Sequence, residues 1–245
     1  MQSSKSTRFG KFYEHEAGQY HARRYGTRYG NLFRRLHHHV LRELLRDVPP
    51  ASNVLEVACG TGHTTELLAE QGYRLVACDL TPKMMTQAYE RLKISGSFVR
   101  ADAFRLPFPE HAFDAVVSTR FLHLFPHAEQ RALLMEMRRV LKPHGKLVVD
   151  FDNFVSRWLW ALPFLIYNLI RYRRLAPDTN YNRIRQTERT LESVGFKDIS
   201  SQGVGGTHLL LPALLSPDLA YRIGIWHRFK PLRLLAEQFV VCGRA

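Results

Sequence analysis

The fold is decided by the nine residues Val54-Leu55-Glu56-Val57-Ala58-Cys59-Gly60-Thr61-Gly62. They predict an apolar strand that carries a carboxylate at Glu56 and then turns sharply, through small residues, into a helix. Gly60 and Gly62 would allow the backbone to approach a ligand at positions where a Cβ atom would clash. A helix that begins at this turn presents unpaired N–H groups and the positive end of its dipole to that ligand. The stretch therefore predicts a ligand-binding strand–turn–helix unit.

Strands and helices alternate along the chain around this unit. Short apolar runs bounded by turn residues predict strands at 53–58, 73–78, 97–100, 113–118, 146–151, 196–202 and 239–242. Apolar residues at helical spacing predict helices at 61–71, 81–93, 128–141 and 183–194, and an aromatic, basic helical segment at 12–45. Strands that alternate with helices of this length form βαβ units and a parallel sheet with right-handed crossovers. We therefore expect an α/β, Rossmann-like, doubly wound fold.

Acidic residues stand at or near the ends of the predicted strands. Asp79 ends the second strand, seventeen residues after Gly62, and its carboxylate could accept both hydroxyls of a ribose. Asp102-Ala103 follows the third strand, where a side chain and the backbone could read the edge of an adenine. Alone, each residue is equally compatible with a helix cap or a tight turn. Because open parallel sheets bind ligands at the carboxyl ends of their strands, the order and spacing of these residues predict a nucleoside-containing ligand.

These residues resemble the motifs of class I S-adenosylmethionine (SAM)-dependent methyltransferases, especially the group that acts on small molecules. The stretch 54–62 is similar to the first motif of that family, 81–85 and 102–108 to its adenine-flanking segments, and 113–116 and 139–147 to its later motifs. The resemblance implies SAM as the cofactor and a seven-stranded, mostly parallel sheet with an antiparallel last strand. The residues that we expect to bind the cofactor are Tyr20, Glu56, Ala58, Cys59, Gly60, Gly62, Asp79, Leu80, Met84, Asp102, Ala103 and Thr119. Ala58 stands where many members have a glycine.

The resemblance also divides the chain into segments. We expect an N-terminal helical cap at 1–50, the SAM-binding Rossmann-like core at 51–152, a basic and aromatic insertion at 153–190, and the C-terminal part of the same core at 191–245. In this family, N-terminal helices and the insertion commonly cover the substrate pocket. We therefore expect the insertion to form a helical substrate lid. Aromatic residues of both segments would close the pocket, namely Tyr13, Tyr20, Tyr25, Trp158, Trp160, Phe164, Tyr167 and Tyr172.

The methyl acceptor is expected to be a hydrophobic or aromatic small molecule that receives the methyl group by direct SN2 displacement. Alignment alone can supply about 7–11 kcal/mol of such a barrier, so a general base is needed only where the acceptor must lose a proton early. His123 is the candidate for that catalytic role, because it follows the fourth strand and its unperturbed pKa is about 6.5. Lining the pocket is its alternative role, and Asp150 and Asp152 are weaker candidates.

The distribution of charge leaves other acceptors open. The formal net charge is +13, and residues 1–50 hold 10 Lys/Arg against 4 Asp/Glu, whereas 51–150 are nearly neutral. Such basic segments attract nucleic acid, membrane surfaces or anionic substrates, so RNA, DNA or a membrane lipid remain alternative acceptors. The charge is not gathered into one stripe, which argues against nucleic acid. Peripheral membrane contact through 158–174 stays open, with its arginines at the headgroups.

Two further classes of function compete with methyl transfer. A nicotinamide-dependent dehydrogenase has the fingerprint G-x-G-x-x-G, whereas here position 63 is a histidine. A dehydrogenase turn also accommodates a pyrophosphate, whereas Glu56 could neutralise the amino group of a methionine moiety. A SAM-binding module without enzymatic activity is the second alternative.

No metal site is expected. Consecutive residues on a helix point about 100° apart, so His37-His38-His39 cannot converge on one ion and is expected to form a polar helical face. Cys59, Cys78 and Cys242 lie in apolar, strand-like stretches, which indicates reduced structural thiols. The N-terminal residues lack an apolar signal core, and the longest nearly apolar stretch, 158–170, is shorter than a membrane span. We therefore expect a cytoplasmic protein, and the pattern does not determine its oligomeric state.

Overall fold

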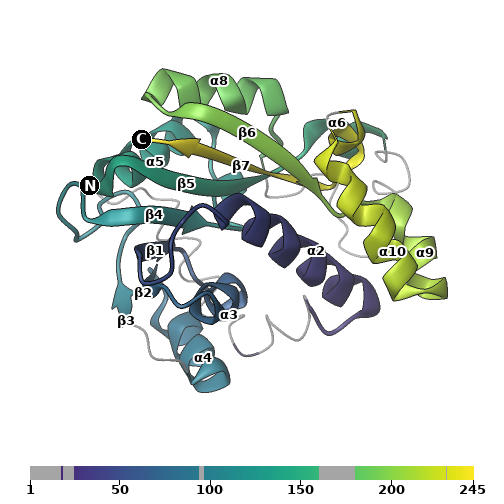
Figure 1. Cartoon of the computed structure of the whole chain (residues 1–245), viewed down its shortest axis with the longest axis horizontal. Helices are drawn as coiled ribbons and strands as arrows, with labels where there is room; N and C mark the ends of the chain where they lie inside the picture. The colour runs from purple at the N-terminus through teal and green to yellow at the C-terminus, as the bar shows by residue number, and fades with distance from the viewer. Residues whose placement is uncertain (1–17, 19–24, 94–96, 160–179, 230) are drawn as a thin grey trace.

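The computed structural model describes residues 18, 25–93, 97–159, 180–229 and 231–245. Its sheet has seven strands in the order β3-β2-β1-β4-β5-β7-β6 (Figure 1). The strands are β1 (Asn53–Val57), β2 (Arg74–Asp79), β3 (Ser97–Arg100), β4 (Phe113–Ser118), β5 (Leu141–Asp152), β6 (Lys197–Val204) and β7 (Gln238–Arg244). All pairs among β1 to β5 are parallel, whereas β7 runs antiparallel to both β5 and β6. The predicted Rossmann-like sheet with an antiparallel last strand is therefore confirmed.

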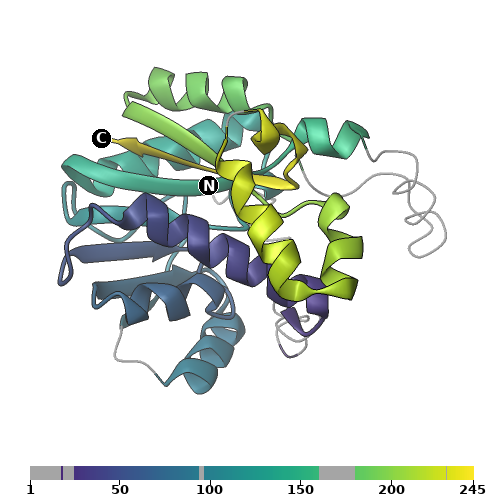
Figure 2. The same ribbon diagram turned by 45° about the vertical axis from the view of Figure 1, so that its right-hand side comes forward.

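Helices cover both faces of this sheet. They are α2 (Arg28–Leu45), α3 (His63–Glu70), α4 (Pro82–Leu92), α5 (His127–Val140), α6 (Phe154–Leu159), α8 (Ile184–Val194), α9 (Leu210–Leu215) and α10 (Pro217–Gly224), with short 3-10 helices η1 (Leu122–Leu124), η2 (Thr207–Leu209), η3 (Ile225–Arg228) and η4 (Leu232–Leu235). Because strand side chains alternate, Val54 belongs to the buried cluster that includes side chains of α2 and α3, whereas the adjacent Leu55 belongs to the cluster that includes side chains of α5 and α8. Figures 1 and 2 show α2 and α8 on opposite sides of the sheet.

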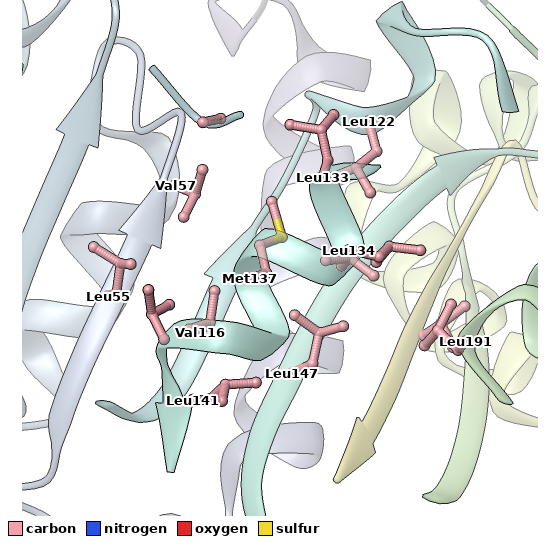
Figure 3. Packing of buried hydrophobic residues seen from close by; sticks show 14 of the residues in the cluster. Leu55, Val57, Val116, Leu122, Leu133, Leu134, Met137, Leu141, Leu147 and Leu191 are labelled. Carbon is pink, nitrogen blue, oxygen red and sulfur yellow. The ribbon is translucent and has the colours of Figure 1, made fainter. Parts of the chain in front are cut away.

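One core lies between α5 and the sheet. Leu133, Leu134 and Met137 project from one face of α5 towards Val116 and Leu147 (Figure 3). All five side chains are buried. Burying a side chain of this size contributes about 1.5–3 kcal/mol, so these contacts fix how α5 lies on β4 and β5. The loop after β4, which reaches the ligand-binding end of the sheet, is thereby anchored.

Helix α2 is covered on two sides, and this corrects the expectation for the three consecutive histidines. One side of α2 packs on the sheet, and the other packs against α10, where a Cβ atom on Gly224 would lie 2.6 Å from Cδ1 of Leu36. His37 and His38 point towards β5 and α3, where Nε2 of His37 lies 3.2 Å from Oδ2 of Asp150 and Nε2 of His38 lies 3.0 Å from O of His63. Both are therefore buried and do not form a polar helical face. Only His39 is partly exposed. Within the described residues, no group of three or more His, Cys, Asp or Glu side chains could hold a metal ion.

The start of β5 differs from the sequence-based expectation. Residues 142–145 were expected to stop a helix before a strand at 146–151. Leu141 already pairs with Phe113, and the register resumes at Ala115 with Lys146, so 142–145 form an irregularity within one longer strand. His144 adopts a φ of 63° there. Residues that adopt this left-handed conformation are typical of turns, so the sequence of 142–145 predicted the end of an element although the strand continues through it.

Several expectations concern residues outside the described ranges. The side chains of Tyr13, Tyr20, Trp160, Phe164, Tyr167 and Tyr172 belong to this group, as does most of the predicted lid. Within the described part of the chain, no helix is long and apolar enough to cross a bilayer. Cys59, Cys78 and Cys242 are buried and free of disulfides, as the sequence predicted.

Candidate active site

A cavity opens where β1, β2 and β4 end, and its wall combines polar and aromatic side chains. The polar ones include Thr64, Asp79 and Thr119, and the aromatic ones include Tyr25 and Phe121. Among the described residues, the lining consists of Tyr25, Val57, Ala58, Cys59, Gly60, Thr61, His63, Thr64, Cys78, Asp79, Leu80, Thr81, Met84, Ala101, Asp102, Ala103, Phe104, Thr119, Arg120, Phe121, Leu124 and Phe125. The cavity thus lies at the carboxyl ends of parallel strands, where open α/β sheets bind ligands.

The turn after β1 brings the backbone to the cavity. Ala58 has a φ of 60°, the left-handed region in which glycine costs nothing and alanine about 1–2 kcal/mol. Two backbone hydrogen bonds hold this turn, from Cys59 N to Cys78 O at 2.9 Å and from Gly62 N to Cys59 O at 3.0 Å. Ala58 therefore keeps the backbone shape that a glycine would give.

The two glycines of the turn have different roles. Gly60 lines the cavity, and a Cβ atom on it would meet no atom within 4 Å. Gly62 is absent from the cavity wall, and a Cβ atom there would lie 2.8 Å from Cδ1 of Leu92 and 3.0 Å from Cβ of Ala88. This corrects the expectation that both glycines make room for a ligand. Gly62 instead allows α3 to pack closely on α4.

Asp79 joins the turn to the end of β2. Its Oδ2 accepts a hydrogen bond from Gly60 N at 2.9 Å, and its Oδ1 accepts one from Thr81 N at 2.8 Å. Burial raises the pKa of Asp79, although the backbone hydrogen bonds oppose this effect. Each carboxylate oxygen can accept a second hydrogen bond, so both can still receive ribose hydroxyls. Thr81 stands at the N-cap of α4, as expected, but its side chain makes no capping hydrogen bond.

Glu56 lies behind the cavity wall and not on it. The carboxyl is buried, and its Oε2 accepts a hydrogen bond of 2.6 Å from Oγ1 of Thr65. Burial raises the pKa of Glu56 to about 8. Glu56 is absent from the lining residues, so the structure does not bring it to a methionine amino group.

Glu56→Gln is expected to reduce the pH dependence of the free energy of unfolding. The pKa of Glu56 is raised from 4.5 to about 8 on folding, so the folded protein keeps a proton that the unfolded chain releases in this window. Wild-type stability therefore falls as the pH rises from about 5 to about 8. A difference of one pKa unit between the folded and unfolded states corresponds to about 1.4 kcal/mol. Between about pH 5 and about pH 8 the free energy of unfolding of the wild type should therefore fall by a few kcal/mol more than that of the variant. Denaturant unfolding at the two pH values measures this, and equal losses would contradict the expectation.

The other expected cofactor residues within the described ranges lie on the cavity wall. These are Ala58, Cys59, Gly60, Asp79, Leu80, Met84, Asp102, Ala103 and Thr119. Two of them are held by short contacts. Asp102 Oδ1 accepts a hydrogen bond from Phe104 N at 3.0 Å, and Thr119 Oγ1 lies 2.7 Å from Oγ1 of Thr64. Tyr20 lies outside the described residues.

His123 is buried beside the cavity but is not among the residues that line it. Its neighbours Phe121 and Leu124 do line the cavity. Burial lowers the pKa of His123, and the charge of Asp152 opposes this effect. The structure therefore places the imidazole of His123 behind the cavity wall, and the lowered pKa favours its neutral form.

Sequence reasoning missed Arg120, which follows β4 and lines the cavity. Its φ is 60°, a conformation that is rare for residues other than glycine. Arg120 N donates a hydrogen bond of 2.7 Å to Oδ1 of Asp150, and Oδ2 of Asp150 lies 3.2 Å from Nε2 of His37. The buried pair of Asp150 and His37 thus fixes the backbone from which Arg120 projects. Only its place after the fourth predicted strand could have indicated this role.

An aromatic group at the cavity was also only partly foreseen. Tyr25 stacks on His63 with ring centroids 4.3 Å apart, and His63 lies 4.7 Å from the ring of His38. Phe125 contacts Phe121 and Phe104 edge to face, at 5.0 Å and 5.3 Å. Such edge-to-face pairs hold rings in fixed positions. The cavity therefore has a preformed aromatic wall next to its polar groups.

The sheet order, the antiparallel β7 and a cavity that joins Asp79 to a glycine turn define a Rossmann-like protein that binds a nucleoside-containing cofactor. Comparison with known proteins narrows this class. Residues 55–149 match the family described as a methyltransferase domain. Over these residues the chain is similar to class I SAM-dependent methyltransferases, and its fold matches theirs. This similarity favours SAM over the nicotinamide cofactor of the dehydrogenase alternative.

Named relatives share the core of the chain. A malonyl-[acyl-carrier protein] O-methyltransferase from Herminiimonas arsenicoxydans is 32% identical over 164 residues, 66% of this chain and 58% of that protein. A demethylmenaquinone methyltransferase from Paenarthrobacter aurescens is 40% identical over 103 residues, 42% of this chain and 40% of that protein. The chain spans about half the length of the curated relatives that it matches.

Similarity of fold extends over nearly the whole chain. Magnesium protoporphyrin IX methyltransferase from Synechocystis PCC 6803, in a crystal structure with bound S-adenosylhomocysteine (SAH), has a TM-score of 0.70 to this chain. The two share 14% sequence identity, and the match covers 98% of this chain and 99% of that one. At this identity the likeness shows the fold alone.

Proposed function

We propose that the chain transfers a methyl group from SAM to a hydrophobic or aromatic small molecule by direct SN2 displacement. One observation carries this proposal. The cavity at the carboxyl ends of β1, β2 and β4 places the carboxylate of Asp79 and the aromatic side chains of Tyr25, Phe121 and Phe125 around one space. A ribose and an apolar acceptor can be bound together in such a site.

The residues on the wall suit the parts of SAM. Asp79 would accept the ribose hydroxyls, because each of its oxygens accepts a backbone hydrogen bond and can take another. Met84, Asp102 and Ala103 would surround the adenine, and Gly60 would let the backbone approach the amino-acid part. Glu56 and Gly62 would support this site from behind, without contact.

SAM supplies a methyl group that is already activated by its positively charged sulfur. The chain must therefore align an acceptor and exclude water, and the aromatic wall of Phe121 and Phe125 provides an apolar surface for this. Arg120 would orient the polar end of the acceptor, since its backbone is fixed by Asp150 and the residue is part of the cavity wall. The names of the relatives contain demethylmenaquinone, malonyl-[acyl-carrier protein] and magnesium protoporphyrin IX, which fit acceptors with a large apolar or a carboxyl part.

The proposal also covers the segments that flank the core, the class of acceptor and the cellular compartment. Residues 1–50 would cap the core of 51–152, and 153–190 would form the lid over the acceptor, with 191–245 completing the core. Small-molecule acceptors are favoured over nucleic acid. Buried free thiols at Cys59, Cys78 and Cys242 suit a reducing compartment such as the cytoplasm.

The test is transfer of a labelled methyl group from SAM to a panel of acceptors. The panel contains a demethylated quinol, a long-chain carboxylic acid, a porphyrin carboxylate, and RNA and DNA. We expect label in an apolar small molecule, with release of SAH. Label in RNA or DNA alone would overturn the choice of acceptor. Tight SAH binding without label in any acceptor would favour a SAM-binding module without activity.

His123→Asn tests whether His123 acts as a general base. The pKa of His123 is lowered by burial, so a base at this position would give wild-type activity that falls only at acidic pH, below about 6.5. If His123 is the base, the variant should lose this acidic limb together with most of its kcat. If the dependence of kcat on pH has the same shape in the variant and the wild type, His123 only supports the wall formed by Phe121 and Leu124. Asp150 and Asp152 would be examined in the same way.

A further inference from the structure

We propose that an exposed apolar face on α9, α10 and η3 docks on the surface of a bilayer that contains anionic lipids. The face consists of large apolar side chains that stay in solvent although they belong to a packed helical layer. Their exposed fractions are 64% for Leu214, 77% for Leu215, 50% for Leu219, 38% for Ile223, 60% for Trp226 and 48% for Phe229. Contiguous exposure of this kind in a folded protein marks an interaction surface.

The packing of α10 explains why these residues face solvent. Ala220 and Gly224 are buried, and Gly224 lies against Leu36 of α2. Leu219, Ile223 and Trp226 follow at spacings of four and three residues, so they form one stripe on the side of α10 and η3 that is turned away from α2. An α10 that only covered α2 would need polar residues on this stripe. The apolar stripe is therefore not explained by the fold.

The charged residues around the apolar face indicate which kind of partner it binds. Arg222 and Arg228 are exposed next to the stripe, and neither has a carboxylate partner among the described residues. The only acidic residue in the sequence between 205 and 236 is Asp218, and Arg35 holds it at 3.0 Å. Arg228 also lies 5.1 Å from the ring centroid of Phe229. Aliphatic and tryptophan side chains flanked by arginines, in a chain of net charge +13, match the acyl boundary and the anionic headgroups of a bilayer.

The position of the face relates it to the cavity. β6 runs antiparallel to β7, as β5 does, so β5 and β6 end on the same side of the sheet. The segment from η2 to η3 follows β6 directly, and Figures 1 and 2 show α9 and α10 at the end of the sheet where β6 ends. The cavity opens at the same end, where β1, β2 and β4 finish. Docking of this face would therefore turn the cavity end of the molecule towards the bilayer.

The experiment measures co-sedimentation of the full chain with vesicles, without cofactor or acceptor. The vesicles contain either phosphatidylcholine alone or phosphatidylcholine mixed with phosphatidylglycerol. We expect binding to the mixed vesicles that weakens with added salt. In the variant L219D/I223D the partition coefficient should fall at least about tenfold, because two charges replace inserted apolar groups. Arg222→Glu combined with Arg228→Glu should abolish the preference for anionic vesicles.

Met135→Asp is the matched control. Met135 is 51% exposed on α5, which covers the other face of the sheet, so its variant should bind vesicles like the wild type. Sedimentation velocity of each protein gives the oligomeric state. The proposal is overturned if the wild type binds neither kind of vesicle, or if the L219D/I223D variant binds the mixed vesicles as strongly as the wild type does. A dimer that L219D/I223D converts to monomer, without vesicle binding, would instead make the face an interface between two copies. None of these results depends on methyl transfer, so the proposed function is tested separately.

Discussion

Asp79→Ala is expected to lower the affinity for SAH at least about 100-fold, because two hydrogen bonds to a charged carboxylate contribute about 1.5–3 kcal/mol each and every 1.4 kcal/mol is a factor of about ten. The substitution removes the acceptor for ribose hydroxyls. It also removes the acceptor of the Gly60 and Thr81 N–H groups, which shape the cavity wall. Calorimetric titration with SAH measures the affinity directly and requires no methyl acceptor.

Two further variants distinguish the loss of a contact with the ribose from a loss of folded protein. Asp79→Asn keeps one carbonyl acceptor at the same place, so we expect an affinity between those of the wild type and Asp79→Ala. Asp218→Ala removes an exposed carboxylate that lies outside the cavity wall, and it should bind SAH like the wild type. Circular dichroism during heating shows that each protein is folded at the titration temperature. If SAH binds to Asp79→Ala within about threefold of the wild type, Asp79 does not hold the ribose.

The sheet could be predicted from the sequence because its signals are local. Apolar runs between turn residues located the strands at 97–100 and 113–118 with the bounds that the structure has. The antiparallel β7 was expected only from the family resemblance, and the order of the strands comes from the structure, since no local pattern encodes which strands become neighbours. The left-handed φ of Ala58 shows why a glycine is common at this position in the family that the sequence resembles.

The buried polar groups could not be predicted because they depend on segments far apart in the chain. His37 and His38 are buried because Asp150, near the end of β5, and His63, at the start of α3, contact them from segments distant in the chain. Asp150 was known only as the end of a strand, and its role emerges from contacts with His37 and Arg120. Such residues have no motif, since their function follows from packing and not from spacing.

Gly62→Ala is expected to reduce the free energy of unfolding by about 2–5 kcal/mol while it leaves the affinity of the folded protein for SAH nearly unchanged. Its φ of 82° lies in the left-handed region, where alanine costs about 1–2 kcal/mol. The added Cβ would also press on Ala88 and Leu92 of α4, and overpacking typically costs about 1–3 kcal/mol. Gly62 is outside the cavity wall, so the cofactor should not meet the new methyl group.

Two other glycines isolate the causes of this effect. Gly72→Ala, at a φ of 74° with no atom within 4 Å of the new Cβ, carries the backbone cost alone and is expected to lose only about 1–2 kcal/mol. Gly60→Ala carries the same backbone cost at a φ of 53°, but its Cβ would enter open space at the cavity wall. We therefore expect Gly60→Ala to unfold like Gly72→Ala and to bind SAH much more weakly than Gly62→Ala. Urea unfolding and calorimetric titration of the three variants measure both quantities. The reverse order of affinities for Gly60→Ala and Gly62→Ala would mean that the cofactor contacts the turn at Gly62, because only then would a buried methyl group against α4 disturb binding more than one at the cavity wall.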